Sequence, residues 1–228
     1  MSSLPHTQTE PAGWHFRAGS GTLRVSASRE ALGSDALMPP CAAEAAVALD
    51  LAGELLDALE AHGLAPATAW QWSSQPELPA SGARALWQGR GAQALLTLPW
   101  AALRQLAQAP VLPGLQWLPA PAECLLAQWR FSDEERAAIE PGGLVLLDAP
   151  CRRPRARSEP GLPGDLPWQL VARWPAPVRV EALMGWEGGL PPWPAEVLLV
   201  ETAWPDAVLA RGRLLPWGSG EALLIETC

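Results

Sequence analysis

Prolines and glycines interrupt this sequence along most of its length, and they limit what it can fold into more than any other feature does. The 228 residues include 25 prolines and 20 glycines. Proline removes a backbone donor and stops helices, while glycine reaches turn conformations at little steric cost. The apolar segments between them are short, so the sequence predicts many turns and excludes a long helical bundle.

The length and net charge of the chain further limit the classes of protein to which it can belong. A chain of this length buries roughly 70–75% of the surface that its unfolded form exposes, which is enough for a core in one large domain or two small ones. The formal net charge is −8 at pH 7, which argues against a nucleic-acid-binding protein. The N-terminus has no apolar run of signal-peptide length, and no run of about 18 residues is apolar throughout. We therefore expect a cytoplasmic protein that does not insert into a membrane.

The one basic cluster is the segment CRRPRARSEPGLPG, residues 151–164. Its arginines lie among prolines and glycines. Two interpretations remain open: a docking loop for an acidic partner and, preferred here, a solvated linker between strands.

The first half of the chain predicts an arm followed by a mixed domain. Residues 1–38 are rich in Ser, Gly, Pro and Thr, and only RVSAS at 24–28 resembles a strand, so we expect a partly ordered arm. Residues 39–117 predict an N-terminal α+β domain. Its strands are expected at 67–72, 83–88 and 92–100, the last two forming a hairpin, with a short helix at 100–108.

The clearest helix follows two prolines at 39–40 and ends at Gly63, a residue typical of helix C-termini. Apolar side chains run along one side of it and acidic side chains along the other. The acidic side suggests a metal site, but no histidine or second carboxylate group lies at ligand spacing, so we interpret it as a solvated face. The buried side comprises Val47, Leu51, Leu55 and Leu59, and the acidic side Asp50, Glu54 and Asp57.

A proline-rich segment at 110–123 marks a domain boundary. Beyond it, residues 118–228 predict a β-rich domain, with strands at 123–131, 143–149, 167–174, 177–183 and 195–201 and a closing hairpin within 208–228. Regular short strands are typical of a small barrel or sandwich. One short helix interrupts them, where Ser132 and Glu135 have the spacing of a capping box. The predicted fold class is α+β: a mixed α/β domain with one long amphipathic helix, then a small β-barrel domain.

Residues for catalysis are few. The sequence has no zinc-protease motif, no nucleophile elbow and no phosphate-binding loop, and it contains no lysine. Cys124 and Cys151 have no histidine near them in sequence. We therefore predict no catalytic, cofactor or metal site, and a binding or assembly module instead of an enzyme. A hydrolase or redox enzyme that uses one of these thiols stays open as a third hypothesis.

Part of the second half resembles a known domain. The strand ECLLAQWRF, the capped helix SDEERAAI, a Glu-Pro-Gly-Gly turn and the strand LVLLD follow the order that opens the SpoA domain of flagellar motor switch proteins and of their type III secretion counterparts. The closing ARGRLLPWGSGEALLIE is similar to that domain's final hairpin. The resemblance covers roughly residues 118–228. It departs from the family at Gly143, where aspartate is usual, and in an insert from Arg152 to about Gly164.

The resemblance implies a structural subunit of the cytoplasmic ring, or sorting platform, of a type III protein secretion system of the HrcQ/YscQ (SctQ) kind. It also implies a place at the cytoplasmic face of the inner membrane. SpoA domains pair by interlocking strands, so the expected partners are a second SpoA-domain protein or another copy of this chain, together with other platform and basal-body proteins. An unrelated cytoplasmic scaffold or chaperone-like binding protein with a small β-barrel remains the alternative. The residues expected to bind the partner are Leu125, Leu126, Leu144, Leu146, Val208, Leu214, Leu223, Leu224 and Ile225.

Overall fold

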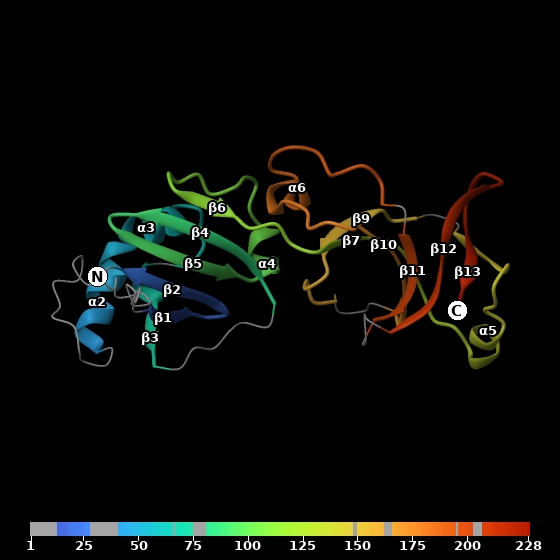
Figure 1. Ribbon diagram of the computed structural model, residues 1–228, viewed down its shortest axis with the longest axis horizontal. Helices are drawn as coiled ribbons and strands as arrows, with labels where there is room; N and C mark the ends of the chain where they lie inside the picture. Colours follow the sequence, from blue (N-terminus) through green and yellow to red (C-terminus); the bar gives the residue numbers. More distant parts are fainter. Residues whose placement is uncertain are drawn as a thin grey trace, which may run out of the picture. The chain divides into compact units, whose positions relative to one another are not determined.

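The computed structural model describes residues 13–27, 41–65, 67–74, 81–147, 150–161, 166–194, 196–202 and 207–228. The chain divides into two compact units, Met1–Leu118 and Pro119–Cys228. Each unit is built around one antiparallel sheet (Figure 1). The predicted N-terminal arm lies outside the described residues at 1–12 and 28–38, whereas residues 13–27 form two paired strands of the first sheet.

The first unit contains a six-stranded sheet with the strand order β3-β1-β2-β5-β4-β6. The predicted hairpin is confirmed as β4 and β5, which turn through Arg90 and Gly91, both at positive φ. The sequence analysis did not predict β1 or β6. The strands are β1 (Gly13–Ala18), β2 (Gly21–Ala27), β3 (Gln71–Ser73), β4 (Ala83–Gly89), β5 (Ala92–Leu98) and β6 (Leu115–Trp117).

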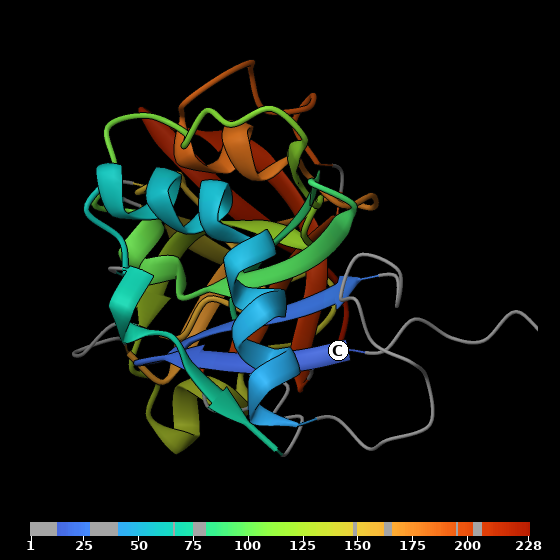
Figure 2. The ribbon, with the colours of Figure 1, turned by 90° about the vertical axis from the view of Figure 1, so that its left-hand side faces the viewer.

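The core of this unit lies on one face of the sheet. Side chains alternate along each strand, so that in β4 Ala85 and Trp87 are buried while Arg84 and Leu86 are exposed. The helices α2 (Ala42–Leu51) and α3 (Gly53–Ala61) lie across one side of the sheet (Figure 2). A 3-10 turn, η1 (Ala67–Ala69), and a short helix, α4 (Trp100–Leu103), complete the unit. The opposite face of the sheet carries the exposed side chains.

The prediction of one long amphipathic helix is wrong, because the helix is broken at Ala52. The backbone N–H of Ala52 donates to Leu49 O, three residues back, and a new helix begins at Gly53. Glycine is about 1 kcal/mol less favourable than alanine inside a helix, so the break falls where the helix is weakest.

The apolar side of the helical segment also changes across this break. Leu55 and Leu59 are buried, as expected, but Val47 is 41% exposed. The buried residues of α2 are instead the small Ala45 and Ala48. Two short helices with separate faces therefore replace the single predicted stripe.

The second unit contains a seven-stranded sheet with the order β8-β13-β12-β11-β10-β7-β9. The predicted closing hairpin is confirmed as β12 and β13, which turn at Gly218 with φ 58°. The strands are β7 (Ala122–Trp129), β8 (Leu144–Leu147), β9 (Arg153–Ala156), β10 (Trp168–Arg173), β11 (Glu196–Glu201), β12 (Val208–Trp217) and β13 (Gly220–Thr227), and the helices are α5 (Asp133–Ala137) and α6 (Val180–Met184).

The prediction of a mixed α/β domain followed by a small barrel is wrong. The second sheet ends at β8 on one side and at β9 on the other, so it has two edges instead of a closed ladder. Closure fails because β9 pairs with β7 and not with β8. Throughout the described ranges, both units are mostly β structure with short helices.

Two further elements differ from the sequence analysis. The predicted strand at 177–183 is the helix α6, which ends at Gly185 with φ 74°. The predicted solvated linker at 151–164 contains the strand β9, and its Arg155 is buried. Residues 162–164 of that segment lie outside the described residues.

Candidate functional site

The second sheet leaves a groove between two strands that are not neighbours in it. This groove, the seam groove, has a volume of about 830 Å³. It is lined by residues 125–129 of β7, residues 146–147 of β8 and residues 151–154, which lead into β9. The two ends of the sheet therefore approach each other without pairing.

Both walls of the seam groove include a strand edge. In the described chain, β8 pairs only with β13. β9 covers β7 over residues 122–125, and one more hydrogen bond runs from Cys151 N to Leu126 O at 2.8 Å. Beyond that bond, no described strand pairs with this side of β7. Unpaired edges offer backbone donors and acceptors to another strand, so the groove can receive an extended segment.

Apolar side chains crowd one face of the sheet beside this groove. Directly paired residues share a face, and the register pairs Leu144 with Leu224. Exposure is 40% for Leu144 and 52% for both Leu146 and Trp217. Exposed apolar clusters of this kind are typical of interaction sites. We call this set the outer apolar strip: Leu144, Leu146, Leu215, Trp217 and Leu224.

The structure divides the nine predicted partner-binding residues between the strip, the groove and the core. Leu223 and Ile225 are 0% and 2% exposed, so these two side chains of the final strand are buried within this chain. Val208 packs against a core cluster that includes Leu125. By location, Leu144, Leu146 and Leu224 belong to the strip, Leu125 and Leu126 line the groove, and Val208, Leu214, Leu223 and Ile225 lie outside both.

The sequence analysis missed two members of the strip. Neither Trp217 nor Leu215 was among the predicted partner-binding residues. The two are separated by two positions on β12, the period that puts side chains on the same face of a strand. That spacing was the available signal.

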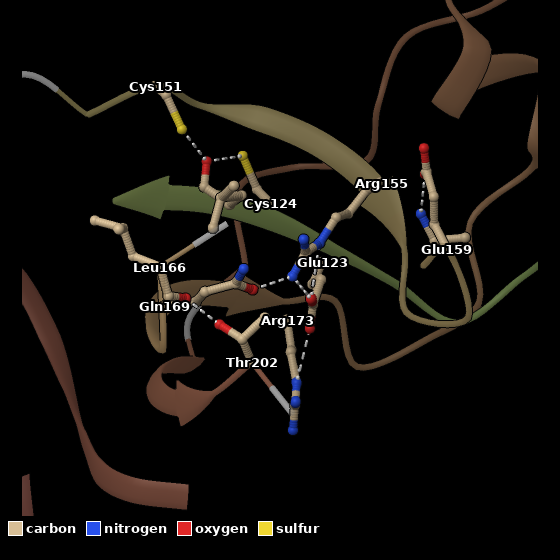
Figure 3. A network of polar contacts seen from close by, with 11 residues as sticks. Glu123, Cys124, Cys151, Arg155, Glu159, Leu166, Gln169, Arg173 and Thr202 are labelled. Atoms are coloured by element: carbon tan, nitrogen blue, oxygen red, sulfur yellow. Dashed lines mark hydrogen bonds and ion pairs between the residues drawn. The ribbon is translucent and has the colours of Figure 1, made fainter. Parts of the chain in front are cut away.

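A buried charge network joins β9 to β7 and β10 (Figure 3). Glu123 lies directly opposite both Arg155 and Arg173 in the sheet. Arg155 Nε and Nη2 donate to Glu123 Oε1 at 3.1 and 2.7 Å, and Arg173 Nε donates to Glu123 Oε2 at 3.2 Å. Arg155 Nη2 also donates to Gln169 Oε1 at 2.6 Å.

The network stabilises the register of β9, because a buried charge needs its partners in place. Glu123 is 3% exposed and Arg155 is 8% exposed. The next residue before Arg155 is Pro154, which lacks a backbone donor and suits an edge strand. β9 is thus held in one position, and the edge of β7 beyond it stays open.

Two cysteines lie close together at the groove. Cys124 and Cys151 direct their Sγ atoms at the same carbonyl oxygen, that of Leu125, at 3.9 and 3.1 Å (Figure 3). Burial raises the pKa of Cys124 to about 11; the neighbouring Cys151 adds to the rise and Arg152 partly offsets it. A neutral thiol is a poor nucleophile. The raised pKa therefore favours the neutral thiol form of Cys124.

At the rim of the groove, Arg152 connects the two ends of the sheet. Its Nη2 donates to Glu221 Oε1 of β13 at 2.6 Å, and its guanidinium lies 5.2 Å from the centre of the Trp193 ring. The Arg152 backbone has φ 44°, which costs a non-glycine residue about 1 kcal/mol or more. Exposed ion pairs contribute about 1 kcal/mol or less. The contact across the rim is therefore weak enough for a partner to replace.

Among the described residues, no group of three or more His, Cys, Asp or Glu side chains is placed to hold a metal ion. No helix in the described ranges is both long enough and apolar enough to cross a membrane. No family model, curated protein or solved structure matches the chain with significance.

Proposed function

We propose that this protein is an assembly subunit that binds a second β-domain along the seam groove. We place it in the cytoplasmic ring, or sorting platform, of a type III protein secretion system, at the cytoplasmic face of the inner membrane. The observation that carries the proposal is the pair of open strand edges, on β7 and β8, beside one groove. The partner is a SpoA-domain protein or another copy of this chain.

The local structure supports the resemblance on which this class rests. The quoted segments fold in the expected order, as β7, α5, a turn at Gly142 with φ 86°, and β8. The predicted capping box of α5 is confirmed: Glu135 N donates to Ser132 Oγ at 3.2 Å, and Ser132 N donates to Glu135 Oε2 at 2.8 Å. The closing hairpin then supplies the strand that pairs with β8.

The outer apolar strip supplies a driving force for this association. Complete burial of a large apolar side chain contributes about 1.5–3 kcal/mol. Leu144, Leu146 and Trp217 are about half exposed, so covering all three contributes roughly 3 kcal/mol. Backbone hydrogen bonds to an added strand supply register and further affinity.

A matched pair of variants tests the proposal. Leu146→Glu places a charge in the groove, while Leu190→Glu places one on an apolar residue of the same unit that does not line it and is 39% exposed. The measurement is co-purification with a SpoA-domain protein encoded near this one, followed by size exclusion with light scattering. We expect Leu146→Glu to weaken the complex at least about tenfold, a change of about 1.4 kcal/mol, and Leu190→Glu to leave it intact.

Circular dichroism and thermal melting of both variants provide the folding control. A wild-type chain that binds neither itself nor such a partner would count against the proposed function as a whole. Equal binding by wild type and Leu146→Glu would place the interface elsewhere on the protein.

A further inference from the structure

Among the residues of its six strands, the first sheet has basic side chains on its exposed face and no acidic side chain. None of the six strands β1 to β6 contains an aspartate or glutamate. Arg17, Arg24 and Arg84 are exposed, and each alternates with buried residues that face the helices. In a chain with a net charge of −8, exposed arginines on strands that contain no acidic residue are a local reversal of sign.

The register places these arginines on one face of the sheet. Arg17 and Arg84 lie at the two ends of one row, separated by Thr22 and by Thr97, which is 5% exposed. Arg24 lies in the adjacent row, directly opposite His15 on β1. Burial and, second to it, the neighbouring charge of Arg24 lower the pKa of His15, because both disfavour the protonated imidazole. We call Arg17, Arg24 and Arg84, with the half-exposed Leu86 beside them, the basic sheet face.

The helices on the opposite side of the same unit carry the reverse charge. α2 and α3 contain Glu44, Asp50, Glu54, Asp57 and Glu60 and no basic residue. All but the first of these are exposed. Glu54 forms an ion pair of 2.9 Å with Arg90 of the neighbouring hairpin. This unit therefore presents an acidic helix layer on one side and the basic sheet face on the other.

We infer that the basic sheet face docks the acidic helix layer of a second copy of this chain. Charge complementarity selects this occupant, because a twofold contact of two sheet faces would oppose arginine to arginine, and like charges across an interface are costly. Apolar contact supports the same arrangement: Leu86 on the sheet is 38% exposed, and Val47 on α2 is 41% exposed.

The contact is heterologous, since it joins two different surfaces. A docked pair leaves one surface of each kind free. The contact therefore propagates into a ring if the rotation closes and into a filament if it does not. It uses the first unit and does not depend on the seam groove of the second.

Two charge-reversal variants test the inference. The sheet variant is Arg24→Glu with Arg84→Glu, and the helix variant is Asp50→Arg with Asp57→Arg. Sedimentation velocity is measured at about 0.01 M and about 1 M salt, where the Debye length is about 30 Å and 3 Å. We expect wild type to exceed the mass of a dimer at low salt and to dissociate at high salt. Each variant alone is expected to associate at least about tenfold more weakly, a change of about 1.4 kcal/mol.

Mixing the two variants gives the decisive readout. Each retains one intact surface, and the two reversed surfaces also carry opposite signs, so an equimolar mixture at low salt is expected to regain association, with the two variants alternating. A chain with all four substitutions restores both complementary signs and is expected to associate like wild type. Neutral Arg24→Gln with Arg84→Gln, checked by circular dichroism, separates loss of docking from loss of folding.

Three results would overturn the inference: no salt-sensitive association of wild type, unchanged association of either variant, or a mixture that remains monomeric. If only the sheet variant loses association, the occupant is an acidic region other than α2 and α3. The measurements are repeated with Leu146→Glu, in which association through the basic sheet face is expected to persist. This measurement distinguishes loss of association through the basic sheet face from loss of association through the seam groove.

Discussion

Replacing Glu123 by glutamine removes one negative charge from between two largely buried arginines. Arg155 loses two charged contacts, and Arg173, 11% exposed, loses one. Breaking a buried ion pair by removing one partner costs about 3–5 kcal/mol. The glutamine oxygen still accepts one hydrogen bond and Gln169 still accepts from Arg155, so we expect the lower end, about 3 kcal/mol.

The same reasoning predicts a rescue. The variant Glu123→Leu, Arg155→Met, Arg173→Met removes every charge of the network and fills the space with apolar atoms. Such replacements are often neutral or stabilising, because no charge is left without a partner. We expect the triple variant to be more stable than Glu123→Gln, although it changes more residues. Effects within one network are not additive, which makes this order informative.

Unfolding in urea, which does not screen charges, measures the change. Circular dichroism gives the transition, and hydrogen exchange with mass spectrometry localises it: β7, β9 and β10 are expected to lose protection while β1 to β6 do not. A loss of less than about 1 kcal/mol for Glu123→Gln would refute the claim that the charges depend on one another. A triple variant less stable than the single one would refute the predicted rescue.

Three further predictions concern single positions. Because burial raises the pKa of Cys124 from 9.0 to about 11, folding favours the neutral thiol, and the stability that this gives is lost as the pH rises from 9 to 11. Cys124→Ala is expected to reduce that loss by about 1–2 kcal/mol in urea titrations. The backbone N–H of Ser132 and, second to it, the Ser132 side chain lower the pKa of Glu135. Because Ser132→Ala keeps the backbone N–H, it is expected to raise that pKa only part of the way to the ordinary value in a carbon-13 NMR titration. A Cβ at Gly212 would overlap a backbone carbonyl oxygen of β13, so Gly212→Ala is expected to lower the free energy of unfolding by at least about 1–3 kcal/mol, whereas Gly189→Ala, in open space, leaves it unchanged.

Local signals in the sequence were enough for several elements. The hairpin at Arg90-Gly91 and the capping box at Ser132 each depend on residues only a few positions apart, and both are confirmed. Elements that depend on the rest of the chain were predicted poorly. The segment 177–183 contains valines typical of strands but forms α6, and the arginine-rich segment at 151–164 contains a strand because Glu123, far away in sequence, pairs with Arg155.

The candidate site shows why its apolar residues could be listed but not sorted. β8 reads Leu-Val-Leu-Leu, so it has no alternation of apolar and polar residues that would mark an outer face. Leu223 and Leu224 are adjacent and equally apolar, yet the first is buried and the second lies in the outer apolar strip. Register alone decides between them, and the register follows from the whole sheet.

The two proposed contacts depend on different forces, and this gives them different roles in an assembly. Contact at the seam groove relies on apolar burial and backbone pairing, which salt does not weaken. Contact at the basic sheet face relies on exposed charges, each pair worth about 1 kcal/mol or less, and it is screened by salt. A ring built from both would therefore hold its paired β-domains firmly while its repeated contacts between first units exchange. Raising the salt concentration is expected to release paired units from the ring before it separates the pairs themselves.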